Sequence, residues 1–371
     1  MKILIAPDKF KGSLSAMEVC EAIGNGFLKS GKAFDLDYHP IADGGDGSVE
    51  VLVGHLDLQA RVIDAQDPLG RGLRATYFTS ANAAFIEVAA ASGLVLLSEK
   101  ERNPLLTSTT GSGKMVVDAI QKGFKTIYLF LGGSSTNDGG MGIAAELGFE
   151  FIETKGNGLK PIGENLSLVE HISYTPKIDL TEVKLILLCD VVNPLFGPNG
   201  AAHVYAPQKG ANPHQVSQLD TGLRHFSQAL MDKTKKDISQ LPGSGAAGGI
   251  AASLVALLDA SIESGFETIS RLTKLEAKIE TADLIISGEG KLDTQSYQGK
   301  VVGEISKLAS KHQKPVALFV GKNDLGAVEI LQNDPIQVSE ILSLTTNEQD
   351  AFKNAAQHLE MLAYDFAQKN I

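Results

Sequence analysis

The stretch PIADGGDGSVE, residues 40–50, joins a predicted strand to a predicted helix. Apolar residues alternate over 34–38, which is typical of a strand, and a helix is expected to begin near Ser48. The loop holds two carboxylates, Asp43 and Asp46, among three glycines. Glycine lets a backbone bend and approach a ligand closely, and ligands bind beyond the carboxyl ends of strands in open α/β sheets. The loop is therefore either a Mg²⁺ and phosphate site or an ordinary Asp/Gly turn.

Composition indicates a globular protein of about two domains. The chain has 371 residues, 43% of them hydrophobic and 21% charged. The net charge of −11 argues against nucleic acid or an anionic membrane as a partner, and an anionic substrate would need a locally basic pocket. Two cysteines in apolar runs, Cys20 and Cys189, suit buried thiols in the cytoplasm, and no apolar run is long enough to span a membrane.

The first seventy residues alternate strand and helix, which predicts a parallel sheet. Residues 3–5 are a short buried strand, and Ser15 with Glu18 forms a capping box that begins a helix. The apolar face of this helix is expected to hold Ala16, Val19, Cys20, Ile23 and Phe27.

The middle of the chain changes character before the strand and helix rhythm resumes near Asp283. Expected there are strands at 75–78, 84–88, 126–131 and 184–189, a helix within 107–122 capped by Thr110, and a buried helix at 248–260. Later strands are expected at 284–286, 316–320 and 341–344. A last helix has its apolar face at Phe352, Ala355, Ala356, Leu359, Leu362, Ala363 and Phe366. Residues 1–68 plus 283–371 then form one parallel-sheet domain, with 69–282 inserted as a second domain.

Two glycine-rich loops could bind anions. GGSSTNDGG, 132–140, follows a strand, and its N–H groups and hydroxyls could hold a phosphate, with Asp138 adding a carboxylate. GSGAAGG, 243–249, fits the dinucleotide spacing, but the polar segment 237–242 before it is no strand, so the dinucleotide interpretation fails. Phosphate binding at a helix N-terminus and close helix packing both stay open for this loop. The sequence GSGK, 111–114, lacks the other residues of a Walker A motif.

Acidic residues also follow two later strands, at Asp190 and at Asp293. Such carboxylates act as general bases or metal ligands, or simply cap loops. The sequence has neither zinc-ligand spacing nor a nucleophile elbow. Carboxylates, glycine loops and lysines together point towards phosphoryl transfer.

The combination of motifs resembles the type 1 glycerate kinase family over nearly the full length. The matching pieces are IAPDKFKGSLSA, PIADGGDGSVE, NPLLTSTTGSGKMVVDAI, GGSSTNDGG, CDVVNPLFG, YAPQKGA, GSGAAGGIAA and SGEGKLDTQSYQGK. The chain departs mildly from the family pattern at Lys9, Gly12, Asp46, Ser48 and Ser135. The resemblance implies a flavodoxin-like domain with a mixed α/β domain inserted, and an active site in the cleft between them. It also implies transfer of the γ-phosphoryl group of ATP to a hydroxyl of glycerate, with Mg²⁺, giving 2-phosphoglycerate in many members and 3-phosphoglycerate in others. We favour 2-phosphoglycerate.

Roles follow as hypotheses. Asp190 is the first choice for the base and Asp293 the second, Lys11 pairs with the substrate carboxylate or the transferring phosphate, and Asp43 and Asp46 hold Mg²⁺. Expected at the nucleotide are Gly132, Gly133, Ser134, Ser135, Thr136, Asp138, Gly243, Ser244, Gly245 and Gly248. Expected at glycerate are Asp8, Lys11, Ser13, Asn193, Gln295 and Lys300. A phosphatase with the same acidic loops and a non-catalytic binding module are the alternatives, and a homodimer is left open.

Overall fold

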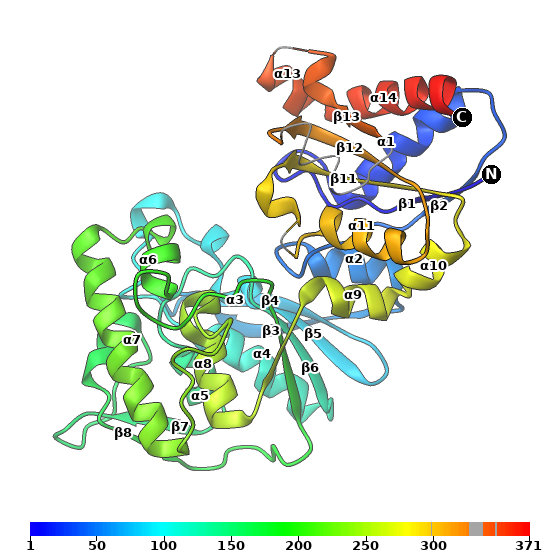
Figure 1. Ribbon diagram of the computed structural model, residues 1–371. Coiled ribbons are helices and arrows are strands. Elements are labelled where there is room, and N and C mark those ends of the chain that lie inside the picture. The colour runs from blue at the N-terminus through cyan, green and yellow to red at the C-terminus, as the bar shows by residue number, and fades with distance from the viewer. Residues whose placement is uncertain (298, 326–336, 346) are drawn as a thin grey trace. The chain divides into compact units, whose positions relative to one another are not determined.

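The computed structural model describes residues 1–297, 299–325, 337–345 and 347–371, and its elements are labelled in Figure 1. The chain divides into two compact units. Unit 1 comprises Met1–Asp43, Glu50–His55 and Ser264–Ile371, and unit 2 comprises Gly44–Val49 and Leu56–Glu263. The sequence placed the limits at 69 and 282. The structure instead assigns residues 56–68 to unit 2, where they enter its sheet, and residues 264–282 to unit 1.

Unit 1 is built on a five-stranded parallel sheet with the order β13-β12-β11-β1-β2. Its strands are β1 (Lys2–Ile5), β2 (Asp35–Tyr38), β11 (Leu284–Leu292), β12 (Val316–Asn323) and β13 (Gln337–Glu340). Both ends of the chain thus contribute neighbouring strands, because β1 pairs with β11. The register Ile3 to Leu284 and Ile5 to Ile286 places continuous apolar strands side by side, as parallel sheets covered on both faces require.

Helices cover both faces of this sheet, with α1 and α14 on one face and α10 and α11 on the other (Figure 1). The helices of unit 1 are α1 (Ala16–Lys29), α9 (Gly265–Thr273), α10 (Leu275–Thr281), η5 (Thr294–Tyr297), α11 (Val301–Lys311), η6 (Ile341–Ser343), α13 (Glu348–Lys353) and α14 (Ala355–Asn370), together with most of α2 (Ser48–His55). The capping box of Ser15 and Glu18 is confirmed. At Gly26 a side chain would lie 2.2 Å from the Glu360 carbonyl, so glycine permits the close packing of α1 on α14.

Unit 2 contains a six-stranded mixed sheet with the order β10-β9-β6-β5-β4-β3. Pairing is parallel from β10 to β5 and antiparallel from β5 to β3. The strands are β3 (Gln59–Gln66), β4 (Gly72–Thr79), β5 (Ala83–Glu87), β6 (Thr126–Phe130), β9 (Lys184–Leu188) and β10 (Ser261–Glu263), with β7 (Phe149–Ile152) and β8 (His171–Tyr174) forming a separate hairpin. Of these, β3 was not predicted, and its exposed positions are both polar (Gln59, Asp64) and apolar (Ala60, Val62).

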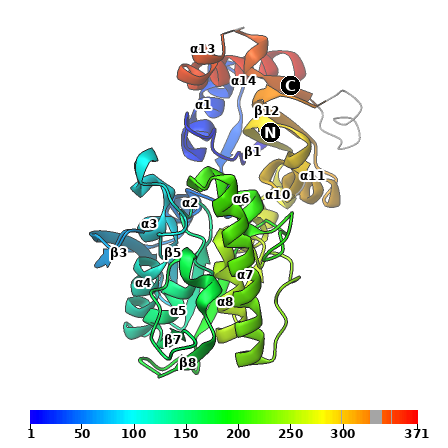
Figure 2. The same ribbon diagram turned by 90° about the vertical axis from the view of Figure 1, so that its left-hand side faces the viewer.

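The helices of unit 2 enclose two apolar cores. They are α3 (Ala89–Ser92), η1 (Leu94–Leu96), η2 (Glu99–Glu101), α4 (Thr110–Gln121), α5 (Met141–Glu146), η3 (Gly163–Leu168), α6 (Ala201–Tyr205), η4 (Pro207–Lys209), α7 (Pro213–Thr234) and α8 (Ala246–Leu258). Figure 2 shows α7 and α8 running side by side. Helix α8 is buried as predicted, since it contributes to both cores.

Three details of the predicted elements are wrong. Thr110 is the first residue of α4 rather than its cap, which is Thr109. The strand expected at 341–344 is the short helix η6, and the strand β13 lies just before it. Phe352 belongs to α13 and is 55% exposed, so it lies outside the apolar face of α14. In each case a short apolar pattern predicted the region of the element but not the residue at which it begins or ends.

Both cysteines are free thiols, with Cys20 buried and Cys189 half-buried. Burial raises the pKa of both thiols above the usual range. Within the described ranges, every helix is too short or too polar to cross a bilayer.

Candidate active site

Unit 1 gathers three carboxyl groups where β1, β2 and β11 present their carboxyl ends. Asp8 follows β1 and its N–H donates to the Gly288 carbonyl of β11 at 2.9 Å. Asp43 follows β2, and its charge acts on both Asp8 and Glu289. Glu289 lies within β11 itself and is 8% exposed. These groups share one neighbourhood because parallel strands end at the same edge of a sheet.

Burial raises the pKa of two of these carboxyl groups well above the usual range. Burial, and then the negative charge of Asp43, raises the pKa of Asp8 to about 7. Burial likewise raises the pKa of Glu289 to about 7, against a lowering by the Ser296 hydrogen bond and by Lys300. Carboxyls with such values are suited to proton transfer and occur most often at functional sites.

The other predicted residues of unit 1 have mixed surroundings. Lys11 is exposed, whereas the backbone N–H of Lys9 donates to Asp8 Oδ1 at 2.7 Å. The Ser13 hydroxyl donates to the Phe352 carbonyl at 2.6 Å, so it holds the C-terminal segment. Lys300 lies near enough to Glu289 to lower its pKa.

The loop after β11 carries two further predicted residues. The backbone N–H of Asp293 donates to Ser296 Oγ at 2.9 Å. The Asp293 carboxylate also lies 3.5 Å from the Lys291 ammonium. Gln295 belongs to η5, and its side chain lies outside the described residues.

In unit 2 the loop 132–140 packs against the second half of the opening motif. A side chain at Gly132 would lie 3.0 Å from the Asp46 N–H, and one at Gly133 would lie 2.3 Å from Asp46 Oδ1. Only glycine fits at Gly133, whose φ is also +68°. The predicted metal ligand Asp46 and the predicted phosphate loop are therefore neighbours.

The hydroxyl groups of this loop are used in different ways. Ser135 Oγ donates to the Ser92 carbonyl at 3.0 Å, which ties the loop to α3. Ser134 Oγ accepts from the Lys209 ammonium at 2.9 Å. Thr136 Oγ1 and both amide atoms of Asn137 are buried without a hydrogen-bond partner among the described residues. Buried polar groups without partners are rare and costly, so this part of the loop is suited to receive a polar ligand.

Asp138 serves the fold of the loop. Its carboxylate accepts from the N–H and hydroxyl of Thr109, both at 2.8 Å, and from the N–H groups of Gly140 and Gly142. Burial raises the pKa of Asp138, and these hydrogen bonds oppose the shift. The carboxylate thus joins the N-termini of α4 and α5.

The loops 190–195 and 243–249 adjoin the same region. Gly139 N–H donates to the Gly248 carbonyl at 3.0 Å, and Gly245 N–H donates to the Asn193 carbonyl at 3.0 Å. The Asn193 side chain donates to the Asn199 carbonyl at 2.8 Å and accepts from the Tyr205 hydroxyl at 2.6 Å. Asp190, half-buried, begins the 190–195 loop directly after β9 and Cys189. Ser244 Oγ is buried and also lacks a partner among the described residues.

The model of the glycerate kinase family matches residues 3–370. The chain belongs to the glycerate kinase family. A glycerate kinase of Bacillus cereus is 38% identical over 370 residues, which cover 99% of this chain and 97% of that one. A glycerate 2-kinase of Escherichia coli is 37% identical, covering 96% and 94%. A solved structure of a proposed glycerate kinase 2 from Salmonella typhimurium LT2 is 37% identical, with a TM-score of 0.85, and covers 99% of this chain and 97% of that chain.

The predicted family, with its glycerate kinase activity, is confirmed. The fold prediction is confirmed as an α/β protein with one parallel sheet and one mixed sheet. Within the described residues no group of three or more His, Cys, Asp or Glu side chains is arranged as a metal site. Binding of Mg²⁺ therefore stays a prediction. This ion needs only one or two protein carboxylates.

Three buried residues near the loops were not predicted. Glu289 stands between two glycines in SGEGK, Lys209 stands in YAPQKGA, and Asn137 stands within GGSSTNDGG. Each motif was recognised, but sequence alone did not show which of its polar side chains are buried. For Glu289 the available signal was a charged residue between two glycines, because small neighbours allow the backbone to pack closely around it.

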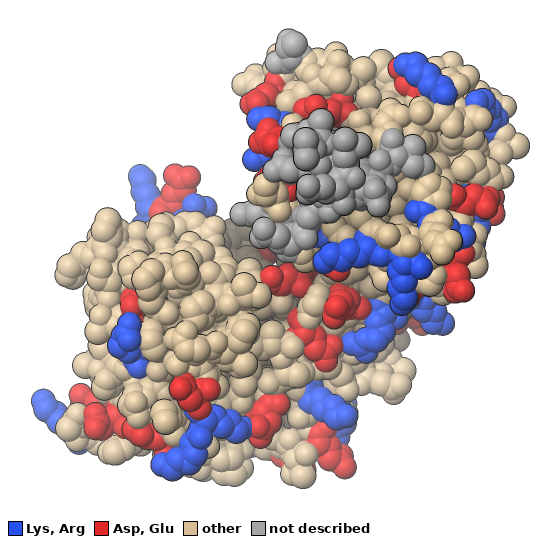
Figure 3. Space-filling model, viewed as in Figure 1, with Lys and Arg blue, Asp and Glu red and all other residues tan. Residues whose placement is uncertain are grey.

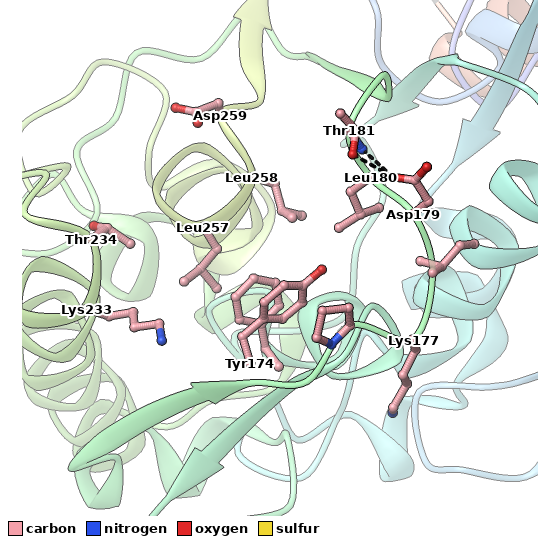
Figure 4. Close-up of a pocket in the computed structure, with 13 residues that line it drawn as sticks. Tyr174, Lys177, Asp179, Leu180, Thr181, Lys233, Thr234, Leu257, Leu258 and Asp259 are labelled. Carbon is pink, nitrogen blue, oxygen red and sulfur yellow. Dashed lines mark hydrogen bonds between the residues drawn. The ribbon is translucent and has the colours of Figure 1, made fainter.

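A separate pocket of about 930 Å³ lies in unit 2, beside the C-terminal ends of α7 and α8. Its lining includes the stacked rings of Phe149 and Tyr174, and Figure 4 shows Asp179 across the pocket from Tyr174, next to Thr181. Helix α8 runs from the 243–249 loop to this pocket, so the pocket lies at the opposite end of α8 from the candidate site. None of the predicted site residues lines it. On the face drawn in Figure 3, acidic and basic side chains are interspersed.

Proposed function

We propose that the chain transfers the γ-phosphoryl group of ATP to the 2-hydroxyl of glycerate and releases 2-phosphoglycerate. The E. coli relative is named a glycerate 2-kinase and aligns over 96% of this chain. The observation that carries the proposal is the contact of Gly132 and Gly133 with Asp46, which brings a carboxylate beside a glycine-rich loop. Phosphoryl transfer needs this combination of phosphate-binding N–H groups and a metal carboxylate.

The residues of unit 2 fit the phosphates of ATP. The 132–140 loop leaves Thr136 Oγ1 and the Asn137 amide buried without partners among the described residues, and Ser244 Oγ adds a third such group. Each could donate to a phosphate oxygen, and the left-handed glycines keep the backbone close. Gly132, Gly133, Ser134, Gly243, Gly245 and Gly248 would supply the rest of this cradle. We therefore place the phosphates of ATP on unit 2.

Asp43 and Asp46 fit Mg²⁺, because hard cations take carboxylate oxygens and keep several water ligands. When bound, Mg²⁺ would neutralise charge on the phosphate oxygens. The protein's own part is to hold the two carboxylates in one short loop, 43–47, in which Gly44 and Gly47 have φ of +92° and +80°.

For proton transfer, Asp190 remains the first choice and Asp293 the second. A carboxylate would accept the proton of the glycerate hydroxyl as the oxygen attacks the γ-phosphorus. Lys11, exposed after β1, would pair with the glycerate carboxylate. Asp8, Asn193, Gln295 and Lys300 would line the acceptor. Ser13 would line it as well. The polar atoms of the Ser13 and Asn193 side chains also make hydrogen bonds within the protein, to backbone carbonyls and to the Tyr205 hydroxyl.

We also propose that unit 1 is flavodoxin-like. Renumbered in order of appearance within unit 1, its strands run 2-1-3-4-5 across the sheet, which is the order of flavodoxin-type folds. A single cleft shared by the two units stays a prediction. A cytoplasmic location, which two free thiols support, and a homodimer also stay predictions.

Product analysis by NMR tests the function. Purified protein with ATP, Mg²⁺ and D-glycerate should give the phosphorus and carbon signals of 2-phosphoglycerate, with ADP formed in equal amount. Signals of 3-phosphoglycerate would move the reaction to the other hydroxyl. Release of inorganic phosphate from phosphoglycerate without ATP would favour the phosphatase alternative, and binding without turnover would favour the non-catalytic one.

A further inference from the structure

Lys209 is a buried cation beneath the 132–140 loop. It ends η4 in the motif YAPQKGA and is 3% exposed. Its ammonium donates to Ser134 Oγ at 2.9 Å and to the Thr136 carbonyl at 2.7 Å. The next residue, Gly210, has φ of +95° and would place a side chain 2.2 Å from the Arg102 carbonyl, so the local backbone admits only glycine. The lysine is thus fixed at both ends, by the close backbone packing at Gly210 and by the two hydrogen bonds of its ammonium group to the 132–140 loop.

Such burial has a cost that the fold only partly offsets. Lysine normally keeps its charged end in water, and a buried ammonium is strongly disfavoured. Burial lowers the pKa of Lys209 to about 7, and the nearby Asp138 carboxylate opposes that shift. A methionine or leucine would fill the same space without this cost. The retained charge is therefore expected to serve the loop above it.

The chemistry of the ammonium group determines how Ser134 can act. A protonated lysine has three donors and no acceptor, so Ser134 Oγ must accept from it. The hydroxyl hydrogen of Ser134 is then directed to a different acceptor. A phosphate oxygen is an acceptor of this kind, and Ser134 lies next to Gly133, where the backbone passes Asp46.

We propose that Lys209 is a positioning residue for the polyphosphate of the nucleotide. It orients Ser134 as a hydrogen-bond donor to a phosphate oxygen, fixes the Thr136 carbonyl, and sets a positive charge below the loop. This inference rests on the proposed function of the 132–140 loop. The ligand class is a nucleoside di- or triphosphate, and Lys209 itself does not touch it.

Binding of MgADP, measured by calorimetry, tests the proposal with four variants and one control variant. Lys209→Met should weaken MgADP binding about tenfold or more while the KM for glycerate stays within about twofold. Ser134→Ala should weaken it less, and the double variant should bind no more weakly than Lys209→Met, because the lysine acts largely through Ser134. Gly133→Ala, which would clash with Asp46, should also weaken binding. Lys177→Met is the matched control, since Lys177 donates to the Ala145 carbonyl at the distant pocket and should leave MgADP affinity unchanged.

The outcomes distinguish the role of Lys209 from the proposed phosphate binding by the 132–140 loop. Wild-type affinity in Lys209→Met, with weakened binding in Gly133→Ala, would overturn the role of Lys209 and leave the loop as the phosphate site. Unchanged affinity in both variants would overturn the proposed function of the loop as well. Fully additive effects of Lys209→Met and Ser134→Ala would overturn the route through Ser134. If Lys209→Met fails to fold, Ser134→Ala alone decides, because unchanged MgADP affinity there contradicts the proposal.

Discussion

At the scale of single residues, Asp190 gives the sharpest kinetic prediction. Asp190→Asn keeps the size of the side chain but removes a base, so kcat should fall by about 10² to 10⁴ while the KM for glycerate changes little. Steady-state assays with both substrates varied would measure this. Asp179→Asn is the control, because Asp179 caps the backbone of Thr181 at the distant pocket. Turnover near the wild-type rate in Asp190→Asn would pass the role to Asp293.

His39 predicts how stability depends on pH. It is fully buried, and burial followed by the neighbouring His55 lowers the pKa of His39 to about 3. The unfolded chain takes up a proton below about pH 6.5, whereas the folded chain does not, so stability is lost as the pH falls through this range. From about pH 6.5 to about pH 5 the loss should reach about 2 kcal/mol.

Urea unfolding of His39→Gln at those two pH values checks this. The glutamine stays neutral, so the variant should lose less stability between the two values than the wild type does. The exposed His171 in the control His171→Gln should leave the wild-type difference intact. Equal losses in wild type and His39→Gln would show that other groups cause the acid sensitivity.

The motifs selected the candidate loops from sequence, but burial determines which contacts each side chain makes in the structure. Ser13 and Ser135 were predicted as ligand contacts, and in the structure both hydroxyls donate to backbone carbonyls. Lys209 and Glu289 drew no prediction and are almost completely buried. Local sequence names the residue types of a site, whereas residues distant in sequence determine which polar atoms are enclosed.

At the scale of elements, the start of α8 stores backbone strain. Ala247, Gly248 and Gly249 are left-handed, with φ of +52°, +73° and +90°. Left-handed geometry costs a non-glycine residue about 1–2 kcal/mol, so Ala247→Gly should leave stability unchanged or raise it by up to about 1 kcal/mol. Gly248→Ala should cost several times more, because its side chain would lie 2.1 Å from the Thr136 carbonyl. Guanidinium unfolding of both variants, with MgADP titration, makes the comparison. A stable Gly248→Ala variant would contradict this close approach of the two loops.

Long apolar segments were predictable and mixed ones were not. Helix α1 agrees with its capping box, and the residues expected on its apolar face are buried. By contrast, β3 pairs along its whole length with β4 yet exposes much of its surface, so its sequence carries little apolar alternation. β3 is a strand because it pairs with β4, and this pairing outweighs the weak strand propensity of its own sequence.

At the scale of the whole molecule, the discontinuous chain was predictable because both ends show the same strand and helix rhythm. The sheet of unit 1 joins β1 to β11 across nearly the full sequence. The residues at which one unit ends and the other begins were harder to predict from the sequence. Residues 44–49 lie with unit 2 although Asp43 and residues 50–55 lie with unit 1. No composition change marks that exchange, since it falls inside a single glycine-rich motif.

The division of the chain into two units predicts which segments the nucleotide protects from hydrogen exchange. If unit 2 holds the phosphates, MgADP alone should slow amide hydrogen exchange in residues 132–140 and 243–249, and less so in β1 and β11 of unit 1. At about 100 times its Kd, MgADP should also stabilise the protein against unfolding by about 2.7 kcal/mol. Hydrogen exchange with mass spectrometry measures the first effect and denaturant titration the second. Gly133→Ala should reduce both effects at the same MgADP concentration, because its side chain would displace Asp46 from the loop. Protection confined to the segments around Asp8 and Glu289 would place the nucleotide on unit 1, and the glycine-rich loops of unit 2 would then need another ligand.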